Sequence, residues 1–156
     1  MKRLGVILLL SGIFVACEKE DYSSIPYAHV NYELYPKDAD ELFSRFILIV
    51  DKIRNQKDLI GYEGLLITQS IDRPHVYYAF DLACPTEARR GIHIKPDESG
   101  LSATCAQCGA RFNIATGGDV YGFGNCENGV TRYTLKSYQV ITQSTAIGVR
   151  AHRVVN

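Results

Sequence analysis

Four cysteines in the second half of the chain are the residues best suited to chemistry. Cys105 and Cys108 form a C-x-x-C pair followed directly by Gly109, while Cys84 follows an expected strand and Cys126 lies in a glycine-rich segment. Two thiolates on a tight hairpin point to one centre, and a glycine relieves the turn, as in a metal-binding knuckle. Cys84, Cys105, Cys108 and Cys126 are therefore candidate ligands of one metal site.

Four thiols admit three chemical states. The first is a metal site that holds an all-cysteine [2Fe–2S] cluster or a single zinc or iron ion. The second is a pair of disulfides, which oxidising conditions outside the cytoplasm favour and which allow three pairings. The third is a redox-active C-x-x-C pair, but such a motif opens a helix, whereas residues 109–112 are typical of a hairpin. The metal site is the leading interpretation, and the disulfides are the main alternative.

The rest of the sequence offers no catalytic constellation. It contains no G-x-S-x-G, H-E-x-x-H or phosphate-binding loop, and its four histidines are scattered. The 17 Lys and Arg residues balance the 17 Asp and Glu residues, without a basic cluster. We therefore expect a protein that is not an enzyme and that binds no nucleic acid.

The N-terminus has the order of a bacterial lipoprotein signal peptide. Two basic residues precede an uncharged apolar run that is shorter than the ~20 residues of a membrane-spanning helix. The run ends with Ala16 directly before Cys17, as at the site of a lipoprotein signal peptidase. The sequence predicts that residues 1–16 are a removed signal peptide, that Cys17 carries lipid, and that residues 17–24 form a tether to the membrane.

Residues 18–21, Glu-Lys-Glu-Asp, bear on which membrane face carries the protein. They resemble the acidic, lysine-containing export signal that follows the lipidated cysteine in surface lipoproteins of Bacteroidetes. A solvated charged tether is the alternative interpretation. We expect an exported protein that is lipid-anchored to the outer membrane, with surface display favoured over the inner leaflet.

The elements that must position the cysteines are mostly strands. Ten Tyr, six Phe and many β-branched residues favour sheet over helix. Residues 38–46 are predicted to form either a helical turn, with Asp38 as its N-cap and Glu41 reaching back, or an irregular connector. A tight turn is predicted at Gly117-Gly118. Residues 25–156 are therefore expected to form one all-β sandwich or barrel. The predicted strands cover residues 28–34, 46–53, 64–71, 76–82, 92–94, 101–104, 110–114, 133–141 and 146–155.

The cysteine segments resemble those of a Rieske iron–sulfur domain. Members of that family carry C-x-H in one loop and C-x-x-H-G-x-x-F in a second, followed by a T-G turn and a glycine-rich third loop. The resemblance covers residues 76 to about 141 and implies a cluster-binding subdomain over about residues 82–129. The matching segments, in chain order, are Cys84-Pro85-Thr86, Cys105 to Phe112, Thr116-Gly117-Gly118 and Gly122 to Gly129.

Both histidines of the family pattern are missing, because Thr86 and Cys108 stand in their places. A neutral hydroxyl is a poor iron ligand, so a histidine-ligated [2Fe–2S] centre is not supported. The resemblance instead implies that Cys84, Cys105 and Cys108 occupy three ligand positions and that Cys126 supplies the fourth. An all-thiolate [2Fe–2S] cluster would have a potential near the plant-ferredoxin value of about −400 mV.

Two functions follow from the resemblance. The leading one is a membrane-anchored iron–sulfur or single-metal protein that transfers electrons to a partner that the sequence does not name. The alternative is a degenerate Rieske fold without a cluster, stapled by disulfides, that acts as a structural or binding lipoprotein.

Overall fold

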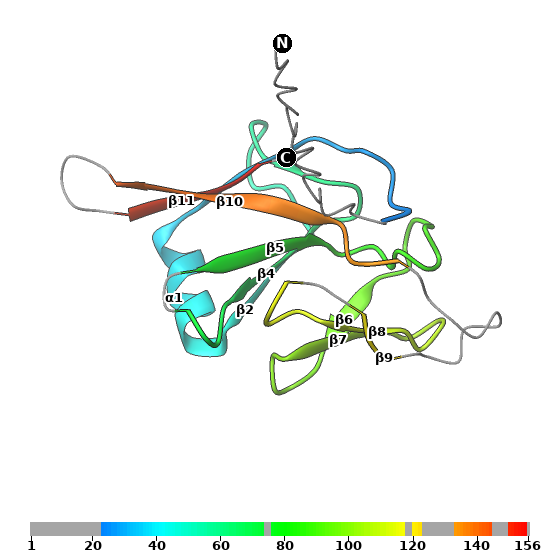
Figure 1. Cartoon of the computed structure of the whole chain (residues 1–156). Helices are drawn as coiled ribbons and strands as arrows, with labels where there is room; N and C mark the ends of the chain where they lie inside the picture. The colour runs from blue at the N-terminus through cyan, green and yellow to red at the C-terminus, as the bar shows by residue number, and fades with distance from the viewer. Residues whose placement is uncertain (1–22, 74–75, 118–119, 123–132, 145–149, 156) are drawn as a thin grey trace, which may run out of the picture.

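The computed structural model describes residues 23–73, 76–117, 120–122, 133–144 and 150–155. Within these ranges lie one helix and eleven strands, arranged in two antiparallel sheets (Figure 1). The all-β fold class is thereby confirmed. The predicted signal peptide, the lipid site Cys17 and the candidate ligand Cys126 lie outside the described residues. No helix in the described part of the chain is both long and apolar enough to span a membrane.

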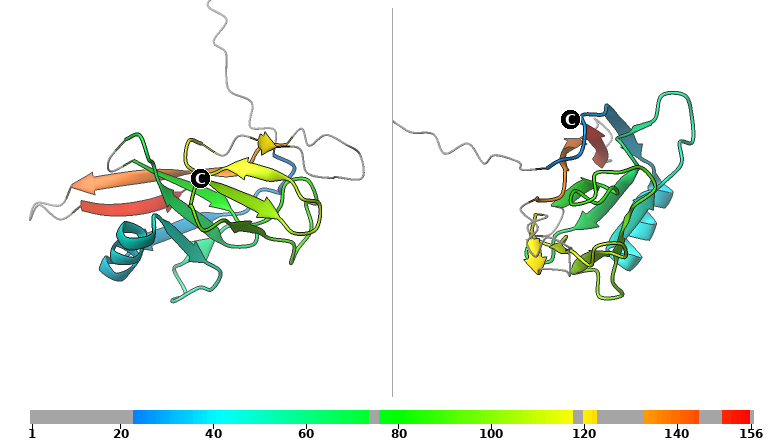
Figure 2. Two further views of the ribbon diagram at one scale, coloured as in Figure 1. Left: turned by 90° about the horizontal axis from the view of Figure 1, so that it is seen from below. Right: turned by 90° about the vertical axis from the view of Figure 1, so that its right-hand side faces the viewer.

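The larger sheet has seven strands and curls strongly, as the end-on view of Figure 2 shows. Strands near opposite ends of the sheet contribute side chains to one apolar core between them. For example, Val30 comes from β1 and Leu48 from β2. In spatial order the strands are β2 (Ile47–Val50), β4 (Leu65–Gln69), β5 (Tyr77–Asp81), β10 (Ser137–Ser144), β11 (Arg150–Val155), β1 (Val30–Leu34) and β3 (Leu59–Ile60).

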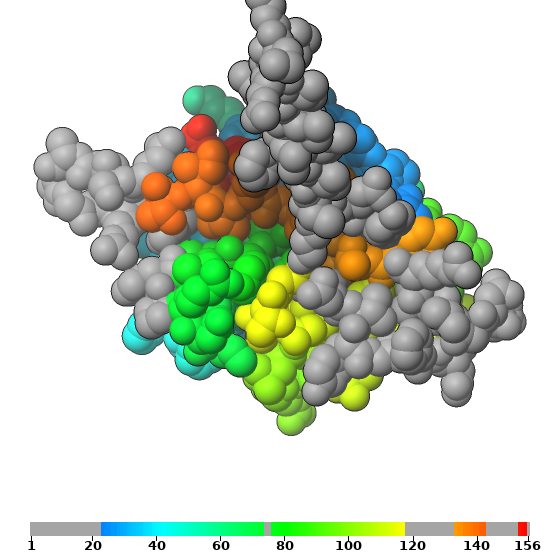
Figure 3. Space-filling model, in the orientation of Figure 1, coloured from blue at the N-terminus to red at the C-terminus, as the bar shows by residue number. Residues whose placement is uncertain are grey.

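The smaller sheet forms a separate layer beside the larger one (Figure 1). On the face drawn in Figure 3, the green atoms of the segment that contains β5 lie against the yellow atoms of the segment around residues 110–117. Its strands are β6 (Ile94–Pro96), β7 (Ser102–Cys105), β8 (Arg111–Asn113) and β9 (Val120–Gly122), in that order. The strand predicted over residues 92–94 begins two residues later than expected, and β3 and β9 were not predicted at all.

Strands β4 and β5 form a wall that is buried on both faces. Side chains alternate across a strand, so Leu65 and Ile67 enter the core inside the large sheet, whereas Leu66 enters a second core toward the small sheet. In β5, Ala79 likewise enters the core inside the large sheet, whereas Phe80 enters the second core. The second core also contains the three described cysteines, so the wall separates the cysteine region from the main core.

Helix α1 (Pro36–Arg45) packs Leu42 into the core inside the large sheet. Its existence agrees with the prediction, but Asp38 as its N-cap is wrong. Tyr35 is the N-cap, and Asp38 lies at the third helical position, where its Oδ2 accepts a bond of 2.9 Å from the Tyr35 N–H. Pro36 displaces the start, because its fixed φ and missing N–H suit the first helical turn. Glu41 does not reach back and instead pairs with Arg45.

Candidate metal centre

The first cysteine loop begins where β5 ends. Its backbone is closed by two hydrogen bonds: the Cys84 N–H donates to the Ile92 carbonyl at 3.0 Å, and the Ala88 N–H donates to the Cys84 carbonyl at 2.9 Å. The hydroxyl of Ser24 donates to the carbonyl of Pro85, which fastens the N-terminal segment to the same loop. The position of Cys84 is therefore fixed by bonds on both sides of it.

A buried carboxylate holds the start of this loop. Asp81 is fully buried and accepts bonds from the Tyr62 N–H at 2.7 Å, the Ala83 N–H at 2.9 Å and the Tyr138 hydroxyl at 2.8 Å. Burial raises the pKa of Asp81, although these hydrogen bonds act in the opposite direction. Asp81 therefore ties β5, β10 and the segment before β4 together, just ahead of Cys84.

The second cysteine loop is the hairpin that joins β7 and β8. Cys105 is the last residue of β7, and its N–H donates to the Ala110 carbonyl at 2.9 Å. The Gly109 N–H donates back to the Cys105 carbonyl at 2.8 Å, and Gly109 has φ 72°, a region that favours glycine. The predicted tight hairpin is thus confirmed. A redox motif that opens a helix is excluded, because β8 follows the turn.

Strand β6 brings the two loops together. Ala83 forms a β-bridge with His93 on one side, and Ile94 pairs with Cys105 on the other. The Ile94 N–H also donates to the Leu82 carbonyl at 2.9 Å. The backbone of residues 82–94 therefore sets the first loop against the end of β7.

The three described thiols meet at one point. The Sγ atoms of Cys84, Cys105 and Cys108 all lie within 4.8 Å of one another, and the Cys84 and Cys108 atoms are 3.7 Å apart. A disulfide needs sulfurs about 2.05 Å apart, so no disulfide joins any two of these three residues. Two thiolates on one tetrahedral metal ion, with bonds of about 2.3 Å, are separated by roughly 3.8 Å.

The surroundings of the thiols are apolar. Cys84 and Cys105 have no exposed surface and Cys108 is 6% exposed, in a core of Leu, Ile, Phe and Ala side chains. Burial raises the pKa of Cys84 far above its usual range, and the neighbouring Cys105 and Cys108 raise it further, whereas a backbone bond from Glu87 lowers it. Thiolates in such a place need a cation to balance their charge.

Histidines do not complete the site within the described part of the chain. The Nε2 atom of His93 lies 2.7 Å from Oε2 of Glu63, and the ring of His29 packs edge-on to Tyr27. The described His, Asp and Glu residues add no ligand atom to the group of three sulfurs. His75 and the side chain of His152 lie outside the described residues. A histidine-ligated cluster does not fit this donor set, whereas soft metals such as zinc and iron do.

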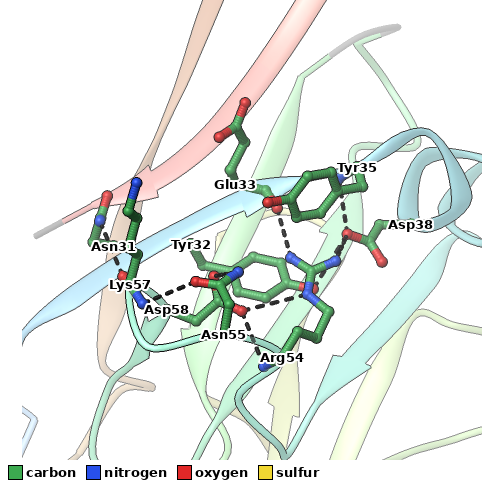
Figure 4. A network of polar contacts seen from close by, with 9 residues as sticks. All are labelled: Asn31, Tyr32, Glu33, Tyr35, Asp38, Arg54, Asn55, Lys57 and Asp58. Atoms are coloured by element: carbon green, nitrogen blue, oxygen red, sulfur yellow. Dashed lines mark hydrogen bonds and ion pairs between the residues drawn. The ribbon is translucent and has the colours of Figure 1, made fainter.

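The sequence analysis missed the residues that position these loops. The sequence around Asp81 shows only a charged residue at the end of an apolar strand. A charge at such a position commonly belongs to a buried polar network, and this was the one available indication of its role. It also missed a clamp in which Arg54 lies between the rings of Tyr32 and Tyr35, 4.2 and 4.3 Å from their centroids (Figure 4). Arg54 bonds Asp38 at 2.6 Å, which fixes the residue 51–58 connection to α1.

Comparison with known proteins adds one structural likeness. No protein-family model and no curated protein matches the chain. Among solved structures it is similar to the cyanobacterial plasma membrane Rieske protein PetC3 from Synechocystis PCC 6803. The TM-score is 0.46 at 14% sequence identity, over 75% of this chain and 92% of the other.

Proposed function

We propose that the mature chain is a Rieske-like lipoprotein of the outer membrane that binds a metal through Cys84, Cys105 and Cys108, with Cys126 as the fourth ligand. We propose further that it transfers electrons when the metal is iron. One observation carries this proposal: three buried sulfurs from two separate loops lie within 4.8 Å of one another, and no two of them are joined by a disulfide.

The donor set indicates the kind of metal. Thiolates are soft ligands that select zinc, copper(I) or iron, and the described site has no carboxylate oxygens for magnesium or calcium. Iron would supply one-electron chemistry at this position. The chain contributes a rigid, apolar, water-poor shell and a backbone N–H from Glu87 to the Cys84 sulfur, and both features tune the potential of an iron–thiolate centre.

The proposed anchor residue Cys17 lies only seven residues before Ser24, which contacts the Cys84 loop. Ser24 bonds the Pro85 carbonyl and Ile25 is buried, so the chain is held to the domain directly beside the Cys84 loop. Seven residues from Cys17 to Ser24 reach at most about 25 Å when fully extended. If Cys17 carries lipid, Ser24 stays within that reach of the membrane surface and the Cys84 loop lies directly beside Ser24, which favours a membrane-associated electron partner.

Metal analysis tests the proposal. The full-length protein, extracted in detergent and purified without oxygen, should contain iron or zinc, and an iron form should absorb visible light through sulfur-to-iron charge transfer. Cys105→Ala should lose the metal. Ile94→Val is the matched control, because it trims the same core by one methyl group, at about 1 kcal/mol, and keeps every thiol.

The opposite result has a defined meaning. Metal-free wild-type protein in which Cys126 is disulfide-bonded to a first-loop or second-loop cysteine would replace the proposal with a degenerate, disulfide-stapled structural lipoprotein. Mass spectrometry of the alkylated protein under non-reducing conditions identifies such a bond.

A further inference from the structure

The spacing of the three sulfurs bears on how many metal ions the site holds. Each pair of Sγ atoms among Cys84, Cys105 and Cys108 lies within 4.8 Å, although the residues come from two loops. The donors thus form a compact triangle, with an edge of 3.7 Å between Cys84 and Cys108.

A single ion and a two-iron cluster require different distances between the three sulfur atoms. On one tetrahedral ion, any two thiolates share the metal and lie about 3.8 Å apart. In a two-iron cluster each iron takes two protein ligands, so at least one of three thiolates binds the second iron. That thiolate lies across the cluster from the others, since two metal ions and their bridging sulfides separate the ligands.

The observed triangle contains no long edge. In the Rieske arrangement the position of Cys108 belongs to a ligand of the second iron, yet the Cys108 sulfur is only 3.7 Å from that of Cys84. Moving Cys108 outward would require the hairpin to change, and the Gly109-to-Cys105 and Cys105-to-Ala110 bonds hold it. Ile94, Ala110 and Phe112 fill the adjoining core and have at most 1% exposed surface.

We propose that Cys84, Cys105 and Cys108 bind one thiophilic metal ion, zinc or iron, and do not hold a two-iron, two-sulfide cluster. This inference rests on the proposed metal-binding function and deepens it. The three thiolates occupy three corners of one tetrahedron. A zinc ion would make the centre a structural clamp between the two loops, because zinc has no redox chemistry.

Stoichiometry tests this inference separately from the proposed function. The full-length protein is produced in iron-supplemented and in zinc-supplemented cultures and purified without oxygen. Iron, zinc, protein and acid-labile sulfide are then measured on the same sample. We expect one metal ion per chain and no labile sulfide in either preparation.

Two other results would overturn the single-ion inference, and they differ in what they mean for the proposed function. Two irons and two sulfides per chain would overturn the single-ion inference and leave the proposed metal-binding function intact. A metal-free protein in both preparations would overturn both.

Cobalt(II) gives a second readout that does not depend on growth conditions. Titrated into the chelator-treated, reduced protein, it should saturate at one equivalent and show the intense ligand-field bands of a tetrahedral thiolate complex. Cys84→Ala and Cys108→Ala should each weaken these bands or abolish them, whereas Ile94→Val should keep them. Circular dichroism checks that each variant is folded, and octahedral-type spectra in the folded wild type would overturn the inference.

Discussion

The Sγ atoms of Cys84 and Cys108 lie 3.7 Å apart, although 24 residues separate the two positions in the chain. Strand β6 produces this proximity, since it pairs with the chain near Cys84 on one side and with β7 on the other. The contact therefore depends on backbone registers, which in turn depend on how β5 is anchored.

Gly61 is predicted to be essential for anchoring Asp81. Gly61 has φ +81°, and a Cβ built there would lie 2.7 Å from both Asp81 Oδ2 and the Tyr138 hydroxyl. Gly61→Ala should cost about 1–2 kcal/mol for the backbone conformation and about 1–3 kcal/mol more for the disturbed buried bonds. Urea denaturation monitored by circular dichroism measures this loss.

Gly91→Ala is the matched control for Gly61→Ala. Gly91 has φ +78°, but a Cβ there meets nothing within 4 Å. It should therefore cost only the conformational part. Equal losses in the two variants would contradict the role given to the Asp81 network.

The Arg54 clamp should be intolerant of lysine. A lysine cannot reproduce the planar stacking between Tyr32 and Tyr35, nor hold Asp38 and the Glu33 carbonyl together. Arg54→Lys is expected to lower the free energy of unfolding by about 2 kcal/mol. Arg45→Lys on the exposed face of α1 should change it by less than about 0.5 kcal/mol. Similar values for both variants would show that the clamp contributes little.

Asp97 should give the domain an acid-sensitive component of stability. Hydrogen bonds from the Ser102 and Ser99 hydroxyls, at 2.6 and 2.7 Å, lower the pKa of Asp97 to about 2. An unfolded aspartate titrates near pH 3.9, so the stabilisation is complete above about pH 4 and is lost as the pH falls through about 2.

Asp97→Asn tests this pH dependence. The stability difference between wild type and Asp97→Asn should shrink as the pH is lowered from about 5 to 2. Asp40→Asn, at an exposed position of α1, is measured alongside as a second Asp→Asn variant. A difference for Asp97→Asn that does not change with pH would refute the assignment.

The lipid anchor is tested by Cys17→Ala. Because the proposed acyl chains on Cys17 would hold the protein to the membrane, the variant should move from the membrane fraction to the soluble fraction. Ultracentrifugation followed by immunoblotting measures the distribution. A variant that still sediments like wild type would show that another feature holds the protein to the membrane.

Much of the fold was predictable because its signals are local. The alternation Val30, Tyr32, Leu34 appears in the structure as buried side chains facing one core, and Gly117 has the positive φ expected of its turn. The hairpin at Cys105 and Cys108 was predictable for the same reason, since a C-x-x-C pair followed by a glycine favours a tight turn. Strand β3 was not, because a two-residue strand carries no periodic pattern and exists only through pairing with β1.

The grouping of three cysteines was predictable, whereas the residues that support them were not. The C-x-x-C-Gly pattern and the resemblance identified Cys84, Cys105 and Cys108, which lie together in the structure, and Cys126 as a fourth ligand stays a prediction. No local pattern could show that Asp81 would bond Tyr138 across 57 residues, or that β4 and β5 would separate two cores. Such relations arise from tertiary packing, which spacing along the chain does not encode.

The most direct test of the metal centre is an anomalous-scattering crystal structure of the protein purified without oxygen, with data collected at the absorption edge of the metal found by elemental analysis. We predict one anomalous peak about 2.3 Å from the Sγ atoms of Cys84, Cys105 and Cys108. A map without a peak at this point, or with one of these sulfurs in a disulfide, would contradict it.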